Sequence, residues 1–315
     1  MTKVLITGIS GFAGSHLADY LLSLGNYEIS GTYLDESSLK NLTSQNLNLH
    51  KLNLLEKEAT EALVDSTKPD LLFHLAALTS PKDSFDAPEA TFVNNISAQI
   101  AILEAVAKHC PETKILIVSS AEIYGIVSRK DLPISEETPL NPTNPYAVSK
   151  LAQDFLGLQY FLSHKLKIVR VRPFNHVGPR QAPIFVVSSF AKRIAEIEGG
   201  KEKVMKVGNL KSKRDFTDVR DMVKAYLLAL EKGRLGDVYN LGSGKSYEIK
   251  DILDKMISKS SAKISIETSE SLMRPSDNPE LVCDFSKFNK LTGWSPEIDI
   301  DKTLEDTLEY WRGIV

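Results

Sequence analysis

A tyrosine and a lysine four residues apart, Tyr146 and Lys150, form the pattern with the clearest chemical meaning in this chain. Residues four apart lie on one face of a helix, so a helix here would bring the phenol and the ammonium into one site. The nearby cation would favour the phenolate and let the tyrosine exchange a proton with a hydroxyl or carbonyl near neutral pH, although a free phenol has a pKa of about 10. The same spacing also fits an ordinary pair on the surface of a helix.

Two serines upstream stand where a third catalytic group would be expected. Residues 114–118 are predicted to form a strand that delivers Ser119 and Ser120, and open α/β sheets place their chemistry at the carboxyl ends of strands. The Ser120 hydroxyl would then bond the same substrate oxygen as Tyr146. The alternative is a serine-rich turn in which the hydroxyls cap the backbone.

Three glycines, Gly8, Gly11 and Gly14, follow the first predicted strand and precede a helix that opens at Ser15. A turn without side chains lets backbone N–H groups and a helix N-terminus approach a pyrophosphate. Glycine is also common in any strand-to-helix turn, so the pattern gains its weight from the strand before it and the helix after it. It predicts a binding site for NAD or NADP.

The choice between NAD and NADP depends on the residues that follow the second strand. Asp35 could accept hydrogen bonds from the ribose hydroxyls of NAD, if the strand does not end too early and leave it in a solvated turn. Ser37, Ser38 and Lys40 could instead meet the additional phosphate of NADP. The acid shifts the expectation slightly toward NAD.

Short β-branched runs alternate with longer amphipathic stretches along the chain. This order predicts the α/β class, with a Rossmann-type doubly wound parallel sheet that would position these groups. The predicted strands are residues 3–7, 28–33, 71–74, 114–119 and 167–171, and the predicted helices are residues 15–24, 56–67, 95–109 and 145–165.

A stretch rich in proline, glycine and asparagine, residues 173–183, interrupts the alternation. Residues 1–172 are therefore predicted to form the dinucleotide-binding lobe. Residues 173–315 should form mainly a smaller α/β lobe for the substrate, and segments within residues 215–241 should return to the first lobe.

The composition excludes several other classes of protein. Hydrophobic residues make up 42% and charged residues 25% of the 315 positions, which is typical of a folded globular chain. A net charge of -3 provides no positive field for nucleic acid. Two cysteines without metal-ligand spacing predict neither disulfides nor a metal site and fit a reducing, cytoplasmic setting. The first residues run directly into a strand, and we expect no membrane-spanning segment.

Together these motifs resemble the extended short-chain dehydrogenases, the NAD-dependent epimerase/dehydratase superfamily, over essentially the whole chain. The resemblance is carried by Gly8, Gly11, Gly14, residues 74–77, Ser120, Tyr146, Lys150 and residues 172–175. Residues 172–181, 214–221 and 274–279 look most like those of GDP-4-keto-6-deoxy-D-mannose reductases, with GDP-mannose 4,6-dehydratases as close relatives.

The resemblance implies a catalytic set of Ser120, Tyr146 and Lys150, with Glu122 as a possible further catalytic residue. Along the cofactor it implies Gly8, Ser10, Gly11, Phe12, Ala13, Gly14, Asp35, Asn53, Leu54, Leu75, Ala76, Ala77, Asn95, Tyr146, Lys150 and Pro173. Along a nucleotide sugar, expected to be GDP-linked, it implies Thr79, Ser120, Asn175, Val186, Arg214, Arg274 and Asp277. Related enzymes often pair through helices like residues 95–109 and 145–165, so a homodimer is expected.

Two of these residues have physical arguments of their own. The guanidinium groups of Arg214 and Arg274 suit a diphosphate, because each offers a planar fork of donors. The alternative for Arg214 is an ion pair with Asp215 or Asp218 on the surface.

The same residues bear on the reaction. Reduction of a sugar ketone needs a proton from Tyr146, orientation by Ser120 and the Lys150 cation, whereas a 4,6-dehydratase needs a further acid/base set. Glu122 could serve as that base or be an ordinary buried carboxylate, and Ala121 stands where the dehydratases carry a polar side chain. We therefore expect an NAD(P)H-dependent reductase converting GDP-4-keto-6-deoxy-D-mannose to GDP-6-deoxy-mannose (GDP-rhamnose). A dehydratase, a 4-epimerase and, more remotely, a non-catalytic NAD(P)-binding sensor are the alternatives.

Overall fold

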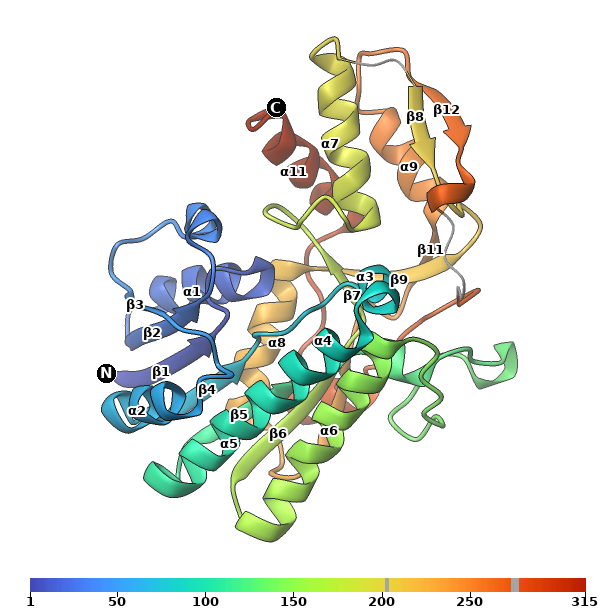
Figure 1. The fold of residues 1–315 in the computed structure, drawn as a ribbon. Coiled ribbons are helices and arrows are strands. Elements are labelled where there is room, and N and C mark those ends of the chain that lie inside the picture. Colours follow the sequence, from blue (N-terminus) through green and yellow to red (C-terminus); the bar gives the residue numbers. More distant parts are fainter. Residues whose placement is uncertain (202–203, 273–277) are drawn as a thin grey trace.

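A parallel sheet of seven strands carries the larger of two lobes in the computed structural model, which describes residues 1–201, 204–272 and 278–315 (Figure 1). The strand order is β10-β6-β5-β4-β1-β2-β3, and it reverses direction between β1 and β4, which is where doubly wound sheets bind their ligands. The strands are β1 (Thr2–Thr7), β2 (Tyr27–Tyr33), β3 (Asn48–Lys51), β4 (Leu71–His74), β5 (Lys114–Val118), β6 (Lys167–Pro173) and β10 (Val238–Leu241). The predicted fold class is confirmed.

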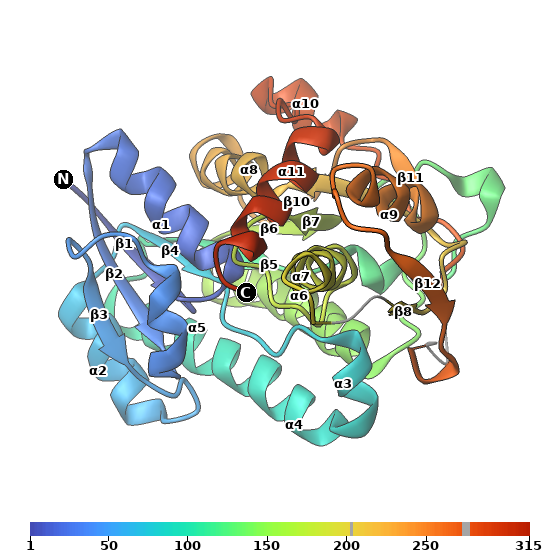
Figure 2. The same ribbon diagram turned by 90° about the horizontal axis from the view of Figure 1, so that it is seen from above.

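Helices cover both faces of this sheet (Figure 2). One face carries α1 (Phe12–Leu24) and α8 (Val219–Lys232), and the other carries α2 (Lys57–Thr67), α5 (Ala98–His109) and α6 (Pro145–His164). Because both faces are covered, central strands are apolar without alternation: Ile115, Leu116 and Ile117 of β5 are all fully buried. Helix α6 begins where the Asn144 side chain accepts a hydrogen bond from the Ala147 N–H at 2.8 Å.

The helix predicted for residues 95–109 begins earlier and is not regular. A continuous helical stretch runs through α4 (Pro88–Phe92), the π-helical turn η2 (Val93–Ser97) and α5. Among the described residues, this stretch alone has the length and hydropathy of a membrane-crossing helix, a feature the sequence analysis did not anticipate. Half of its most apolar window is buried inside the protein, as in a core helix that packs on a sheet.

The smaller lobe is built from two short sheets and three helices. The sheets are β11 (Ser246–Glu248), β9 (Lys213–Asp218) and β7 (Asn175–Val177) in one, and β12 (Ser265–Thr268) with β8 (Val204–Val207) in the other. The helices are α7 (Val186–Glu198), α9 (Ile249–Ile257) and α11 (Ile300–Arg312), whose inner faces share one apolar core. The remaining short elements are α3 (Pro81–Asp86), α10 (Ser286–Thr292), η1 (Glu36–Asn41), η3 (Ala121–Tyr124), η4 (Arg129–Asp131) and η5 (Glu270–Leu272).

The chain returns to the larger lobe after it has entered the smaller one. After β7 and β9, it forms α8 on the large sheet and then β10, which pairs in parallel with β6 from Val238 opposite Arg170 to Leu241 opposite Pro173. Asp218 ends β9 and caps α8 by accepting a hydrogen bond from the Arg220 N–H at 2.8 Å. Asp218 is therefore both the last residue of a strand in the smaller lobe and the N-cap of the helix that leads back to the larger lobe.

A buried ion triad fastens α6 to the large sheet. The fully buried carboxylate of Asp154 on α6 binds two guanidinium groups of β6, those of Arg170 and Arg172. The Arg172 Nε lies 2.8 Å from Asp154 Oδ2, and its Nη1 donates to the Tyr124 hydroxyl at 3.0 Å. The helix that bears Tyr146 and Lys150 is thus held to the strand beside β5.

Candidate active site

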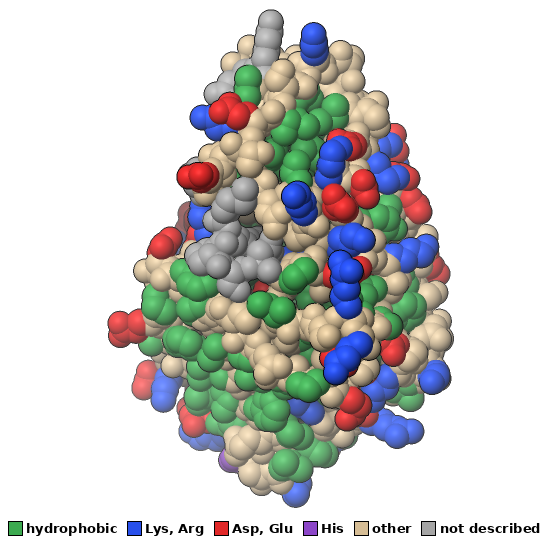
Figure 3. Space-filling model, turned by 90° about the vertical axis from the view of Figure 1, so that its right-hand side faces the viewer, with side chains coloured by type: hydrophobic (Ala, Val, Ile, Leu, Met, Phe, Trp, Pro, Cys, Tyr) green, Lys and Arg blue, Asp and Glu red, His purple; other side chains and the backbone are tan. Residues whose placement is uncertain are grey.

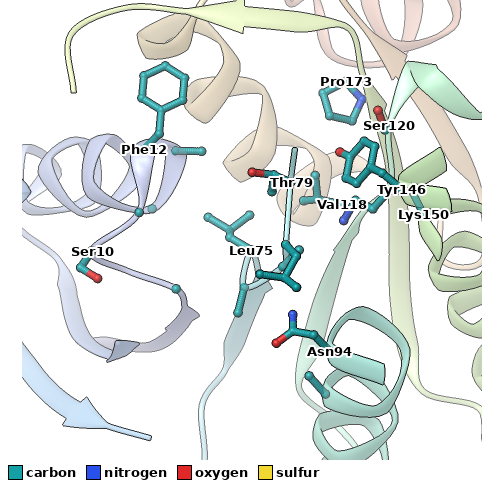
Figure 4. A pocket seen from close by; sticks show the side chains of 18 of the residues that line it. Ser10, Phe12, Leu75, Thr79, Asn94, Val118, Ser120, Tyr146, Lys150 and Pro173 are labelled. Atoms are coloured by element: carbon teal, nitrogen blue, oxygen red, sulfur yellow. The ribbon is translucent and has the colours of Figure 1, made fainter. Parts of the chain in front are cut away.

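A cleft of about 490 Å³ lies at the carboxyl ends of β1, β4, β5 and β6, between the two lobes. Figure 4 shows Ser120, Tyr146 and Lys150 gathered on one side of it, with Phe12 and Ser10 on the other. Most of the residues proposed from the sequence line this cleft: Gly8, Ser10, Gly11, Phe12, Ala13, Gly14, Asp35, Asn53, Leu54, Leu75, Ala76, Ala77, Thr79, Ser120, Glu122, Tyr146, Lys150, Pro173 and Asn175.

The glycine turn forms the wall of the cleft next to α1. Gly8 has a φ of +70°, a conformation that favours glycine, and a Cβ there would lie 3.0 Å from the Ala76 Cα. No side chain caps the N-terminus of α1 at Gly11, so the N–H groups of its first turn remain free of a side-chain acceptor. The N–H groups of this turn can therefore bind a pyrophosphate, which is what a dinucleotide-binding site must do.

We predict that Gly14→Val disrupts the glycine turn. A Cβ at Gly14 would lie 2.3 Å from the Gly8 carbonyl oxygen and 2.9 Å from the Ile9 Cα, so backbone atoms must move. We expect the dissociation constant of NAD(P)H, measured by fluorescence titration, to rise at least about tenfold, and the unfolding free energy to fall by about 1–3 kcal/mol. Gly199→Ala is the control, because its Cβ would meet nothing closer than 3.4 Å. Equal affinities would contradict the assignment of this turn to the cofactor.

Asp35 lies beyond the end of β2, in the solvated turn that the sequence analysis considered. Its carboxylate accepts hydrogen bonds from the Ser37 hydroxyl at 2.7 Å and the Ser37 N–H at 2.9 Å, and these two bonds lower its pKa. Ser38 also lines the cleft, with its hydroxyl 2.7 Å from that of Ser10. Lys40 is not among the lining residues. The site thus offers one carboxylate and a pair of hydroxyls beside it.

The serine pair after β5 has both of the roles that the sequence left open. The Ser120 side chain caps η3 by accepting a hydrogen bond from the Glu122 N–H at 3.2 Å, and Ser120 also lines the cleft. The Ser119 hydroxyl donates to the Lys150 carbonyl at 3.1 Å. Ser119 therefore joins the end of β5 to the helix that bears Tyr146 and Lys150.

Tyr146 and Lys150 are not a surface pair, since only 8% and 5% of their surfaces are exposed. Burial raises the pKa of Tyr146 to about 12; the hydroxyl of Ser120, which hydrogen-bonds the phenol, opposes this increase, and the charge of Glu122 adds to it. Burial lowers the pKa of Lys150 to about 7. In the free protein the expected stabilisation of the phenolate by Lys150 is not seen, because burial dominates the pKa of Tyr146. Tyr146 is held as a protonated phenol.

The buried lysine gives the protein a pH-dependent stability that Lys150→Met should remove. The pKa of Lys150, about 7, lies below its ordinary value of 10.5, so the unfolded chain binds more protons between these values. The unfolding free energy contributed by this group therefore rises with pH in that window, by up to about 1.4 kcal/mol per pH unit. In urea titrations at pH 7, 8 and 9, the variant should lack this rise, whereas a Lys108→Met control, at an exposed lysine, should keep it. Parallel profiles for wild type and Lys150→Met would disprove the shift.

Glu122 and Ala121 are neighbours in the cleft wall, and only Glu122 has a side chain that can exchange a proton. The Glu122 carboxylate accepts a hydrogen bond from the Asn144 side-chain amide at 3.3 Å and lines the cleft. Ala121 lines it too and offers only a methyl group. One carboxylate beside the phenol is therefore the only candidate acid/base contributed by η3.

Several proposed residues are not brought to the cleft wall. Asn95 is fully buried behind it, where its side chain accepts from the Leu78 N–H at 2.8 Å, and its neighbour Asn94 lines the cleft instead. Val186 and Arg214 are outside the lining residues, and Arg214 Nη1 donates to the Asn278 carbonyl at 2.6 Å. Arg274 and Asp277 lie outside the described residues.

The alternative partners proposed for Arg214 are engaged elsewhere. Asp218 pairs with Arg220 at 2.6 Å, and Asp215 is buried where it accepts from the Ser243 hydroxyl at 2.6 Å. Arg214 itself is buried, with 7% of its surface exposed. A solvated surface pair therefore does not describe this arginine.

The cleft also has lining residues that the sequence analysis did not identify, notably His176, Gln181, Phe185 and Tyr226. His176 stacks on Phe12 with ring centroids 5.6 Å apart, and burial lowers its pKa. Gln181 is buried with a side-chain oxygen that has no partner among the described residues. These residues come from the smaller lobe and α8, so no local spacing pointed to them.

Other kinds of site find little support in the described part of the chain. No group of three histidine, cysteine, aspartate or glutamate residues there is placed to hold a metal ion. Cys110 and Cys283 are both free thiols.

A doubly wound sheet, a glycine turn at the start of α1, and a serine, a tyrosine and a lysine converging on one cleft define an extended short-chain dehydrogenase. The family model for GDP-mannose 4,6-dehydratase matches residues 5–307. The chain belongs to this family, which confirms the resemblance recognised in its sequence.

Individual relatives cover three activities. A GDP-6-deoxy-D-mannose reductase of Pseudomonas aeruginosa is 32% identical over 99% of this chain and 98% of its own length. A GDP-mannose 4,6-dehydratase of Vibrio cholerae is 26% identical over 95% of this chain and 91% of its own. The solved structure of RMD from Pseudomonas aeruginosa complexed with NADPH covers both chains completely at a TM-score of 0.87 and 32% identity. A UDP-glucose 4-epimerase of Thermus thermophilus with NAD, 27% identical, also covers both completely with a TM-score of 0.87.

Proposed function

We propose that this protein is an NAD(P)H-dependent reductase of a nucleotide-linked 4-keto-6-deoxyhexose, acting on GDP-4-keto-6-deoxy-D-mannose to give GDP-6-deoxy-D-mannose. The observation that carries the proposal is the buried, protonated Tyr146 beside Ser120, with the methyl group of Ala121 next to them. Reduction of a ketone requires one proton donor, and this site provides one. The similarity to a GDP-6-deoxy-D-mannose reductase over nearly the whole chain supports the same reaction.

Each catalytic residue of the cleft has a separate role in the proposed reduction. When bound, a dihydronicotinamide would supply the hydride for the carbonyl carbon at C4. Tyr146 holds the proton that passes to the ketone oxygen, and Ser120 orients that oxygen with its hydroxyl. Lys150 would donate hydrogen bonds to the ribose of a bound cofactor, and its charge would stabilise the tyrosinate that remains after proton transfer.

Binding roles follow from position in the cleft. The turn from Gly8 to Gly14 would hold the pyrophosphate, and Leu75, Ala76 and Pro173 would pack along the cofactor. Thr79 and Asn175 line the same cleft and are assigned to the sugar. The resemblance supports Val186, Arg214, Arg274 and Asp277 as residues that bind the nucleotide sugar.

We expect NADH to be preferred over NADPH. The Asp35 carboxylate follows β2, where Rossmann sheets hold the adenosine ribose, and it would accept hydrogen bonds from ribose hydroxyls but repel a 2′-phosphate. The neighbouring hydroxyls of Ser10 and Ser38 carry no charge to offset that repulsion. The ratio of kcat/KM for the two cofactors measures the preference.

The second candidate is a GDP-mannose 4,6-dehydratase, favoured by the family model and by Glu122. A dehydratase must remove the C5 proton and protonate the departing C6 hydroxyl. Glu122 could take the first proton, but it is already hydrogen-bonded to Asn144, and Ala121 cannot provide the second. A 4-epimerase is a further alternative: like the dehydratase, it begins with oxidation at C4, for which Tyr146 would act as the base.

The test uses purified protein and freshly prepared GDP-4-keto-6-deoxymannose, with NADH or NADPH followed at the nicotinamide absorbance band. Loss of absorbance that depends on the keto sugar supports the reductase. GDP-mannose alone is the parallel sample. A keto sugar formed from it, without consumption of NADH or NADPH in the first sample, would replace the reductase with a dehydratase.

We also infer a homodimer that forms through α6. Hydrophobic side chains gather on the lower part of the face in Figure 3, which belongs to the larger lobe. On α6, Val148, Phe155 and Leu162 are exposed by 39%, 49% and 57%, and a spacing of seven residues puts them on one side of the helix. Val93 of η2, next to α6, is 46% exposed. A second copy of this surface would bury the stripe, as the resemblance to paired enzymes implies.

We predict that Phe155→Glu gives a monomer, because the carboxylate would have to be buried in the middle of the stripe. Sedimentation velocity should show a dimer for the wild type and for Leu24→Glu, a control at an exposed leucine of α1 on the opposite face of the sheet. A wild type that sediments as a monomer would end the proposal.

The two free cysteines fit a reducing, cytoplasmic setting for such an enzyme.

A further inference from the structure

In the π-helical turn η2, the backbone carbonyl of Asn95 accepts a hydrogen bond from a side chain near the active site. A wider turn interrupts the regular pattern of hydrogen bonds in a helix, and such turns are frequent at functional sites. The carbonyl oxygen of Asn95, in the middle of η2, accepts a hydrogen bond from Gln153 Nε2 at 2.9 Å. The Asn95 side chain donates to the Ser149 hydroxyl at 2.9 Å. The turn is thus fixed to α6 at Ser149 and Gln153, which lie on either side of Lys150 in the sequence.

Gln153 connects this carbonyl with the catalytic lysine. It is 1% exposed, and its Oε1 accepts a hydrogen bond from Lys150 Nζ at 2.7 Å. The amide cannot be turned over, because its oxygen would then face the Asn95 carbonyl. On the other side, the Gln153 backbone carbonyl accepts from Gln99 Nε2 at 2.8 Å. The side chain is therefore held in one orientation, with its acceptor directed at the lysine.

The surroundings of the ammonium contain no competing charge. Among the described residues, no carboxylate forms an ion pair with Lys150, and Gln153 Oε1 is the one side-chain acceptor within hydrogen-bond distance of Nζ. The titratable groups near it are Tyr146 on the same helix, Glu122 beyond that phenol on η3, and His74 of β4. The His74 ring is 3.5 Å from Gln153 Nε2 and stays neutral, because burial and the Lys150 charge lower its pKa to about 3.

We propose that Gln153 is a positioning residue that holds the Lys150 ammonium in the cleft through one of its three N–H groups. The other two N–H groups then remain available to a cofactor bound in the cleft that Lys150 lines. A neutral acceptor suits this task, since it stabilises the charged lysine without neutralising it as a carboxylate would. The inference rests on the proposed role of Lys150 in the cofactor site, but not on which nucleotide sugar is the substrate.

The test is the pH dependence of NADH binding, measured by nicotinamide fluorescence without any sugar. Affinity should fall in the wild type as Lys150 loses its proton above pH 7. Gln153→Leu removes the acceptor, so the midpoint should move to lower pH by at least about one unit, which is a tenfold weaker affinity at a fixed pH above it. Gln153→Glu should move the midpoint to higher pH, because a carboxylate stabilises the ammonium, and it keeps the test decisive if the leucine variant does not fold.

Gln99→Leu is the matched control for a purely structural role. Gln99 is a fully buried amide in the same network, and it contacts the backbone of Gln153 but not the lysine. We expect a lower Tm for this variant and an unchanged midpoint. Midpoints that coincide in wild type, Gln153→Leu and Gln153→Glu would overturn the proposal, and so would a wild-type affinity that does not change with pH. Failure of the reductase assay would leave this titration unaffected, so the two ideas fail separately.

Discussion

Tyr146→Phe is expected to lower kcat for the keto sugar by about 10²–10⁴-fold, while the dissociation constant of NADH stays within about twofold of the wild-type value. The change removes the proton donor and leaves the buried ring in place. Because the phenol has a pKa of about 12 in the free protein, its proton is present throughout the working range of pH. Stopped-flow measurement of a single turnover separates this chemical step from product release.

The control for this variant is Tyr160→Phe, which removes a hydroxyl from another largely buried tyrosine of the same helix, outside the cleft. Its kcat should equal that of the wild type. If Tyr146→Phe also retained full kcat, the assignment of Tyr146 as proton donor would be wrong, whatever the substrate. If both variants lost activity in parallel with their Tm, the effect would be one of folding.

The second large effect is on stability. Asp154→Ala should lower the unfolding free energy by about 3–5 kcal/mol, because it leaves the buried guanidinium groups of Arg170 and Arg172 without their shared carboxylate. This is a large part of the roughly 5–15 kcal/mol that holds a typical domain together. Urea unfolding followed by tryptophan fluorescence gives the difference.

A surface ion pair provides the comparison. Lys51→Ala breaks the exposed pair of Lys51 with Glu36, and we expect it to cost no more than about 1 kcal/mol. Replacing Asp154, Arg170 and Arg172 together by Leu, Met and Met should recover most of the stability that Asp154→Ala loses, since no charge is then left unpaired in the core. A loss below about 1 kcal/mol for Asp154→Ala would mean that water reaches the triad.

The first half of the fold was predictable because its signals are local. The runs that form β1 and β5 are apolar on both faces, and the pattern of α6 extends over twenty residues, with Asn144 and Pro145 at its start. The edge strand β3 has four residues, none of them fully buried, so no hydrophobic pattern identified it. The π-helical turn η2 is hydrogen-bonded to α6, and no local motif in the sequence predicted it.

The residues of the site also divide into those that local spacing predicts and those that it does not. The glycine turn, Ser120, and the pair of Tyr146 and Lys150 were found from their spacing, since each group lies within a few residues of a strand end or on one helix. Tyr226 and Gln181 reach the same cleft only through the packing of α8 and the smaller lobe. The direction of the Tyr146 pKa shift was missed for a related reason: burial decides it, and burial is a property of the folded chain.

The path of the chain between the lobes determines when the larger one can be completed. β6 is not an edge strand, because β10 covers its outer side, and α8 covers one face of the sheet beside it. During synthesis, the first 172 residues therefore emerge with an uncovered strand and an exposed apolar face, which is the condition under which nascent chains aggregate. The sheet that carries the dinucleotide site is complete only when β10, which ends at Leu241, has paired with β6. The two lobes are therefore interleaved along the chain, because α8 and β10 of the larger lobe follow β7 and β9 of the smaller one.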